Sequence, residues 1–173
     1  MSIHIIIDGY NLIRQSDYLS TIDLEDIQLG RKALIDMLAA YKKIKPHRIT
    51  VVFDGAQALH VARHRDRQKG ISIIFSHNGQ SADAVIKKMA ADQKQQALVV
   101  SSDQDIIQSA KFSGAATISA PDFEDKLILS AHMDGMGPGR DDFDGWKPTT
   151  KKRGPSRRPT RRQRKNNAKI RKL

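Results

Sequence analysis

The sequence predicts an α/β fold, in which a mainly parallel central sheet of about five strands lies between layers of helices. Short runs rich in Ile and Val alternate with longer helical patterns over residues 1–133, as expected for βαβ units. The short runs are nearly continuous in apolar residues, which is typical of strands covered on both faces. With 173 residues, the chain is long enough for one domain with a hydrophobic core and too short for two.

The predicted elements follow one another in a regular order. The apolar runs predict strands at residues 3–7, 49–53, 71–75, 98–101 and 116–119. Between the strands, apolar residues recur at helical spacing over residues 24–44 and 82–95. Two shorter helices are expected at residues 103–112 and 122–133, the second with Pro121 near its first turn.

Charge divides the chain into a slightly acidic body and a strongly basic tail. Residues 1–146 contain 17 Lys/Arg and 19 Asp/Glu, whereas residues 147–173 contain 13 Lys/Arg and no acid. The tail also has three prolines and almost no apolar residues, so it is predicted to be disordered when alone. Residues 134–146 are rich in Gly and Asp and are interpreted as a linker between a domain at 1–133 and the tail.

The tail predicts a nucleic-acid partner, because a run of cations without acids binds phosphate backbones through counterion release. RNA and DNA fit this charge equally. A solubilising extension and a tail for anionic membranes are the alternatives, but nothing apolar would anchor the tail in a membrane. The tail residues expected to bind RNA are Lys151, Lys152, Arg153, Arg157, Arg158, Arg161, Arg162, Arg164 and Lys165.

Several classes of protein are excluded or disfavoured. The chain has no cysteine, which excludes disulfides, cysteine-based metal centres and thiol nucleophiles and fits a cytoplasmic location. Asp8 interrupts the first apolar run, so we expect neither a signal peptide nor a membrane span, and a soluble protein. The sequence lacks G-x-G-x-x-G, G-x-x-x-x-G-K-[ST] and G-x-S-x-G, which disfavours a nucleotide cofactor and an α/β hydrolase.

Acidic residues follow four segments of the predicted sheet. Asp8 ends the first strand (IIIDGYN), Asp54 follows the second (VVFDG), and Asp103 and Asp105 follow the fourth (VVSSDQD). The third strand is followed by SHNGQSAD, which places Asp83 in the first turn of the next helix. Because ligands of open α/β sheets bind at the carboxyl ends of the strands, these five carboxylates are expected to converge.

Carboxylates that converge repel one another and favour a divalent cation. Mg²⁺ or Mn²⁺ is the expected ion, since both take carboxylate oxygen, leave positions for phosphate oxygens and activate water. The favoured reaction is therefore phosphodiester hydrolysis. Taken singly, Asp83 and Asp103 also fit helix N-terminal positions, and Asp54 before a glycine fits an ordinary turn.

A second basic stretch, HVARHRDRQKG, precedes the third predicted strand. Two interpretations of it stay open: contact with substrate phosphates beside the acidic site, or a charged helix face in solvent. The cations in question are Arg63, Arg65, Arg67 and Lys69.

Four segments together resemble a known family. They are IIIDGYNLI at 5–13, VVFDG at 51–55, GQSADAVI at 79–86 and VVSSDQDI at 99–106. In this order they are similar to the NYN domain of the YacP-like branch, within the PIN-like ribonuclease superfamily. The resemblance covers roughly residues 3–130 and does not include the basic tail.

The resemblance implies a PIN-like three-layer sandwich and a metal-dependent endoribonuclease, without a small-molecule cofactor. Asp8, Asp83 and Asp103 match the family's central metal-binding acids, and the accessory positions are matched by Asn11, Asp54 and Asp105. Many PIN-like enzymes carry a glutamate on a helix that has no counterpart here beyond Asp83, so one ion or two stays open. Relatives in this branch act on ribosome-bound messenger RNA, which extends the expected partners from RNA to the ribosome.

Two other functions stay open beside the endoribonuclease. A noncatalytic RNA- or ribosome-binding factor would bind through the tail and keep the acidic residues without cutting. A nuclease or repair factor acting on DNA would use the same acids, because the tail does not distinguish the two polymers. Oligomeric state is not predicted.

Overall fold

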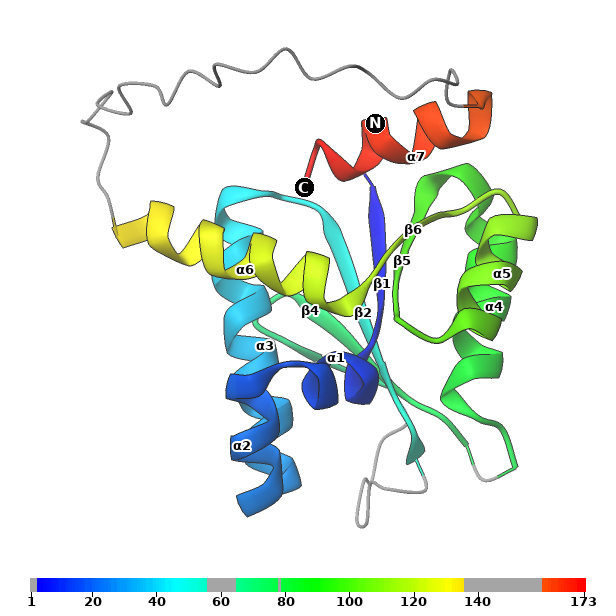
Figure 1. Ribbon diagram of the computed structural model, residues 1–173. Coiled ribbons are helices and arrows are strands. Elements are labelled where there is room, and N and C mark those ends of the chain that lie inside the picture. The colour runs from blue at the N-terminus through cyan, green and yellow to red at the C-terminus, as the bar shows by residue number, and fades with distance from the viewer. Residues whose placement is uncertain (1–2, 56–64, 78, 136–159) are drawn as a thin grey trace, which may run out of the picture.

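A computed structural model describes residues 3–55, 65–77, 79–135 and 160–173. Its centre is a six-stranded sheet in the order β3-β4-β2-β1-β5-β6, covered by helices on both faces (Figure 1). The predicted α/β class with a mainly parallel sheet is therefore confirmed.

Five strands are parallel and correspond to the five predicted ones. They are β1 (His4–Asp8), β2 (Arg48–Phe53), β4 (Ile71–Phe75), β5 (Ala97–Val100) and β6 (Ala116–Ile118). The sixth, β3 (Arg65–Gln68), pairs antiparallel with β4 at the edge of the sheet. All four residues of β3 are exposed and polar, so the strand has no apolar pattern by which the sequence could reveal it.

Helices cover the sheet unequally. On one face lie α1 (Gly9–Gln15), α2 (Asp17–Glu25), α3 (Ile27–Ile44) and α6 (Ala120–Gly135), and on the other α4 (Ala82–Gln93) and α5 (Gln104–Phe112) (Figure 1). The 3-10 turn η2 (Lys94–Gln96) follows α4. The helix predicted over residues 24–44 is confirmed as α3 from Ile27 onward. Its predicted start is wrong, because Asp26 is extended, its side chain accepts from the Gln28 N–H as the α3 cap, and residues 24 and 25 belong to α2.

The core explains the continuous apolar strands. Ile5 and Ile7 of β1 belong to the core against α1, α2, α3 and α6, whereas Ile6 belongs to the core against α4 and α5. All three side chains are fully buried. Both faces of β1 are therefore covered, as its unbroken Ile run predicts. No helix in the described part of the chain combines the length and the hydropathy needed to cross a bilayer.

The end of the basic tail is folded, contrary to the predicted disorder of residues 147–173. Residues Arg161–Ile170 form α7, which starts with a capping box between Thr160 and Gln163. The helix lies across the amino ends of the strands in Figure 1. Asn166 carries the docking: its Oδ1 accepts from the Thr117 N–H at 2.7 Å and its Nδ2 donates to the Thr117 carbonyl at 3.2 Å.

Two further contacts fix the chain after α7. The Tyr41 hydroxyl donates to the Leu173 carbonyl at 3.1 Å, and the Leu173 side chain lies in the core. Ile170 packs against the same core. A basic composition predicts disorder only if no apolar residue finds a partner, and here Ile170 and Leu173 do. Residues 147–159 lie outside the described part of the chain.

Candidate active site

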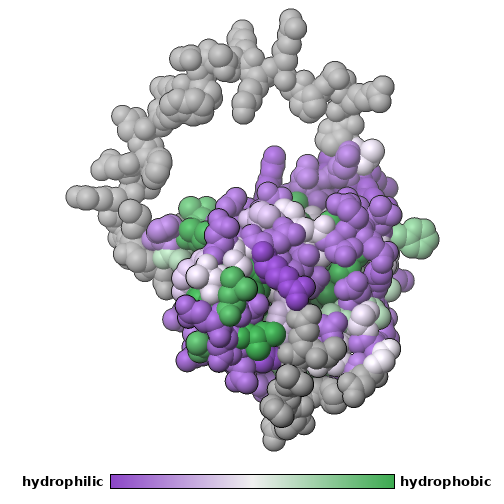
Figure 2. Space-filling view, turned by 60° about the horizontal axis from the view of Figure 1, so that its bottom comes forward, coloured by the Kyte–Doolittle hydropathy of each residue, from purple (hydrophilic) through white to green (hydrophobic). Residues whose placement is uncertain are grey.

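The acidic residues gather where the order of the strands reverses. From β1 the chain proceeds to β2 and β4 on one side, and then crosses to β5 and β6 on the other. Ligands of open α/β sheets bind at such a switch point, at the carboxyl ends of the strands. Figure 2 turns this end of the molecule forward and shows a mostly hydrophilic face, with the larger hydrophobic areas toward one side.

Asp8 is held at the end of β1 by both neighbouring segments. It caps α1, since its Oδ1 accepts from the Asn11 N–H at 3.3 Å, and its Oδ2 accepts from the Ser101 hydroxyl at 3.2 Å. Gly9 permits this tight exit from the strand, because a Cβ there would lie 2.3 Å from Cε1 of the buried Phe53. The carboxylate is thus fixed in orientation before any ligand arrives.

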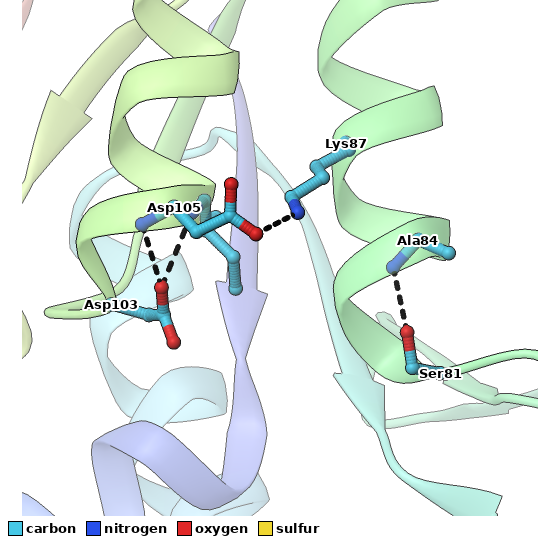
Figure 3. A network of polar contacts seen from close by, with 6 residues as sticks. Ser81, Ala84, Lys87, Asp103 and Asp105 are labelled. Carbon is cyan, nitrogen blue, oxygen red and sulfur yellow. Dashed lines mark hydrogen bonds and ion pairs between the residues drawn. The ribbon is translucent and has the colours of Figure 1, made fainter.

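Asp103 and Asp105 begin α5 (Figure 3). Asp103 is the N-cap, and its Oδ1 accepts from the Asp105 N–H at 2.7 Å. Its other carboxylate oxygen points away from these amides in Figure 3. The Asp103 N–H donates to the Ser101 hydroxyl at 3.1 Å, so Ser101 links Asp103 to Asp8.

Asp83 comes from a third element, the first turn of α4, which is capped by Ser81. Its charge and that of Asp103 both act on Asp8. Burial raises the pKa of Asp8 to about 6, and repulsion by Asp83 and Asp103 adds to this rise, whereas hydrogen bonds from Asn11 and Ser101 oppose it. The structure therefore brings Asp83 and Asp103 within electrostatic range of Asp8.

These carboxylates do not form a ready ligand set. Within the described part of the chain, no three Asp, Glu or His side chains are grouped so that they could already hold a metal ion. The donors are nevertheless the hard oxygens that Mg²⁺ and Mn²⁺ prefer. Burial, with a smaller contribution from the charges of Asp83 and Asp103, raises the pKa of Asp8, and a divalent cation beside it would oppose that rise.

The accessory residues have different positions. The Asn11 Oδ1 accepts from the Ser102 N–H at 2.9 Å, which ties α1 to the segment between β5 and α5. Asn11 therefore helps to position Asp8 through its own N–H, and the segment before Asp103 through the Ser102 N–H. Asp54 is half-buried after β2, and its charge acts on the pKa of Tyr10, whose ring packs edge-on against Phe53. Asp54 thus lies close enough to Tyr10 to act on its pKa, on the side of the site where Tyr10 packs against Phe53.

Two residues near the acids were not among the predicted site residues. Ser101 is fully buried and bonded to both Asp8 and Asp103. Lys87 forms an ion pair with Asp105 (Figure 3), and this hydrogen bond raises the pKa of Lys87. The spacing of Lys87, one helical turn after Asp83, is the signal that could have found it.

The predicted RNA-binding cations are divided among several regions. Arg65 and Arg67 lie on the exposed edge strand β3, which excludes the charged helix face for these residues. Lys69 follows β3 and forms an ion pair with Asp36 at 2.6 Å. Of the predicted tail cations, four lie in the described part of the chain, on α7, and all four are exposed: Arg161, Arg162, Arg164 and Lys165. Outside the described residues lie Arg63, Lys151, Lys152, Arg153, Arg157 and Arg158.

Comparison with known proteins gives consistent results. The family model for the YacP-like NYN domain matches residues 5–134. The chain is 28% identical over 86 residues to YacP of Bacillus subtilis (strain 168), a protein described as uncharacterized. This match spans 50% of each chain, so it covers half the length of the curated relative.

Solved structures extend the similarity to more of the fold. The crystal structure of Rae1 (YacP) from Bacillus subtilis has a TM-score of 0.65 and 27% identity, covering 78% of each chain. A crystal structure of the same protein with one tryptophan replaced by leucine gives a TM-score of 0.63 and 26% identity, covering 77% of this chain and 79% of that mutant. The chain belongs to the YacP-like NYN domain family, within the PIN-like nucleases.

Proposed function

We propose that the protein is a cytoplasmic, metal-dependent endoribonuclease that hydrolyses RNA phosphodiester bonds. The observation that supports this most is the convergence of Asp8, Asp83 and Asp103 from three separate elements on one sheet end. Burial and the charges of Asp83 and Asp103 raise the pKa of Asp8 to about 6. The ionised form of Asp8 is therefore costly here, and a bound cation would stabilise it.

Asp8, Asp83 and Asp103 would hold one or two Mg²⁺ or Mn²⁺ ions. When bound, such an ion supplies positive charge for the scissile phosphate and lowers the pKa of water. Ser101 and the Asn11 N–H keep the Asp8 carboxylate oriented, which reduces reorganisation when the reaction begins. Hydrolysis puts the oxygen of water on phosphorus and a proton on the leaving ribose oxygen, and a carboxylate of this cluster accepts the second proton.

The basic segment is proposed to hold the RNA. Arg161, Arg162, Arg164 and Lys165 are exposed on α7, and a docked helix presents its cations without the entropy cost of ordering them on binding. Arg65 and Arg67 offer a second contact on β3. The ribosome is proposed as the source of the RNA, on the analogy with this family.

The test is cleavage of matched RNA and DNA strands by the full chain in Mn²⁺, Mg²⁺ or EDTA, with and without ribosomes. The wild type is expected to cut RNA in either metal and to be inactive in EDTA. Asp8→Asn is expected to lose cleavage and keep the fold, because Asn caps a helix as well as Asp does. RNA binding should be unchanged in that variant, and circular dichroism checks folding.

Each alternative has its own result in this experiment. RNA binding without cleavage under every condition, by wild type and variant alike, would indicate the noncatalytic binding factor. Equal or faster cutting of DNA would indicate a DNA nuclease. Normal cleavage by Asp8→Asn would show that the chemistry lies elsewhere.

A further inference from the structure

Phe112 is the most exposed large apolar side chain in the described part of the chain, at 92%. It ends α5, whose buried residues are Ile106 and Ala110. Because burial stabilises an aromatic ring, the folding of this domain does not explain why Phe112 lies in solvent. A ring in this position is accessible to a planar ligand that stacks on its face.

Cations from three elements lie at the same end of the sheet as Phe112. Lys111 precedes it on α5, and Lys94 follows α4, which packs against α5. The first half of α7 reaches this place too, since Lys165 donates to the Gln95 side chain at 3.2 Å. Lys111 of α5 and Ile170 of α7 also line one cavity. The ends of α4 and α5 and the start of α7 therefore meet in one basic corner.

The basic corner consists of Phe112 and four exposed cations, Lys94, Lys111, Arg161 and Lys165. Arg161 and Lys165 are one helical turn apart on α7. The acid nearest to these cations in the sequence is Asp92, two residues before Lys94, so the corner keeps a positive net charge.

We propose that the basic corner binds single-stranded RNA, with one base stacked on Phe112 and phosphates beside the cations. An aromatic ring among cations suits a single strand, because every base has a face that can stack. Bases in a duplex already stack on one another, so the site selects unpaired RNA. This inference rests on the proposed function and specifies the class of RNA.

The position of Phe112 on α5 relates the basic corner to the acids. Asp105 precedes Phe112 by seven residues, so both lie on one face of α5, roughly 10 Å apart along the helix axis. Lys87 of α4 pairs with Asp105 on this face (Figure 3). A single strand that passes the acids can therefore continue along α4 and α5 to Phe112. The stacked base belongs to a nucleotide other than those joined by the bond that is cut.

The experiment measures binding of the full chain to a fluorescent single strand of RNA and to a blunt duplex of the same sequence. Anisotropy is recorded at several salt concentrations, in EDTA. Phe112→Ala should weaken binding of the single strand at least about 5-fold, because one stacked base is lost. Binding of the duplex should be unchanged, and so should the salt slope, since no charge is removed.

Two further variants control for the aromatic ring and for exposed apolar surface. Phe112→Tyr keeps an aromatic ring and should bind the single strand like the wild type. Leu24→Ala removes an apolar side chain of α2 that is 88% exposed, and should bind both RNAs like the wild type.

The cations of the corner have their own signature. Replacing Lys94 and Lys111 together by Gln should weaken binding of the single strand. It should also reduce the salt slope of log K by about 1.4, if each cation neutralises one phosphate of a single strand. An unchanged slope would remove these two cations from the site.

The outcomes separate this inference from the proposed function. Unchanged single-strand binding by Phe112→Ala, or an equal loss in Phe112→Tyr, would overturn the stacking site and keep the nuclease. An equal loss of duplex binding would overturn the selection of unpaired RNA. A loss confined to single strands, in a protein that cuts no RNA, would overturn the nuclease and keep this site. No RNA binding by the wild type would overturn both, and circular dichroism verifies that each variant is folded.

Discussion

The two ends of the central sheet carry opposite charge. At the carboxyl end, α1, α4 and α5 begin with or near Asp8, Asp83 and Asp103, and burial and repulsion hold the pKa of Asp8 at about 6. At the amino end, α7 is rich in cations and contains no acid. One small domain thus separates a cluster of acids from a basic surface.

The separation shows two ways in which a fold holds charge. At the carboxyl end, the strand and helix ends hold Asp83 and Asp103 near the buried Asp8, and their repulsion would be reduced by a bound cation. At the amino end, most cations of α7 are exposed, although Lys169 is half-buried and donates to the Ala97 carbonyl. The helix is docked mainly by Asn166, Ile170 and Leu173. Binding and chemistry are therefore expected to respond to different substitutions.

The largest expected effect compares two acids on the same helix. Asp83 lies in the first turn of α4, at the carboxyl end of the sheet, and Asp92 lies in its last turn, exposed at the other end. Asp83→Asn should lower RNA cleavage by roughly 10³-fold, because a charge that acts in the transition state is lost. Asp92→Asn should leave it unchanged. Single-turnover cleavage in Mn²⁺ measures both, and equal rates would remove Asp83 from the site.

The second effect isolates the amino end. Replacing Arg161, Arg162, Arg164 and Lys165 by Gln should weaken binding of single-stranded RNA about 10²-fold near physiological salt. It should also reduce the salt slope of log K by about 3, if each cation neutralises one phosphate. Fluorescence anisotropy from low to moderate salt gives the slope. The single-turnover rate at saturating RNA should stay the same. A fall in that rate would mean that the α7 cations also contribute to the cleavage step.

A third substitution tests how α7 is docked. Asn166→Ala removes two hydrogen bonds to the Thr117 backbone and leaves that backbone pair unsatisfied. The expected loss in free energy of unfolding is about 1–3 kcal/mol. The neighbouring Asn167 is exposed, so Asn167→Ala serves as the control with little change. Urea unfolding compares the two variants, and equal stability would mean that Asn166 does not hold the helix.

The smallest predicted effect concerns pH at the carboxyl end. In metal-free protein, the raised pKa of Asp8 favours its protonated form in the folded state, so its contribution to stability is full below about pH 4 and is lost as pH rises through about 6. Asp8→Asn does not titrate. Its stability relative to wild type should therefore increase by about 1–2 kcal/mol between pH 4 and pH 7.5, after allowance for partial exposure. Urea unfolding in EDTA at both pH values measures the difference, which should disappear with saturating Mn²⁺.

Part of this organisation follows from local sequence. The Ile run of residues 5–7 predicts a strand covered on both faces, and Ile5, Ile6 and Ile7 are fully buried from the two sides. Acids placed directly after parallel strands must share one end of the sheet, so Asp8 and Asp103 could be brought together by pattern alone. Asp26 was missed as a helix boundary because the apolar spacing continues across it.

Long-range pairings could not be predicted in the same way. The exposed polar strand β3 exists because β4 offers it a backbone partner. Lys87 meets Asp105 only because α4 and α5 lie side by side on one face of the sheet (Figure 3). Local spacing places Lys87 one turn after Asp83, but it predicts neither the pairing of Lys87 with Asp105 nor the pairing of β3 with β4.

Local periodicity and composition were enough to specify the parallel sheet, the strand-end acids and the division of the chain into an acidic body and a basic end. Only the folded molecule shows that the last residues form the helix α7, whose Asn166 bonds to the Thr117 backbone of β6, and that Lys87 forms an ion pair with Asp105. Such contacts join residues 49 and 18 positions apart, and their energies depend on backbone and side-chain geometry that exists only after the sheet has formed.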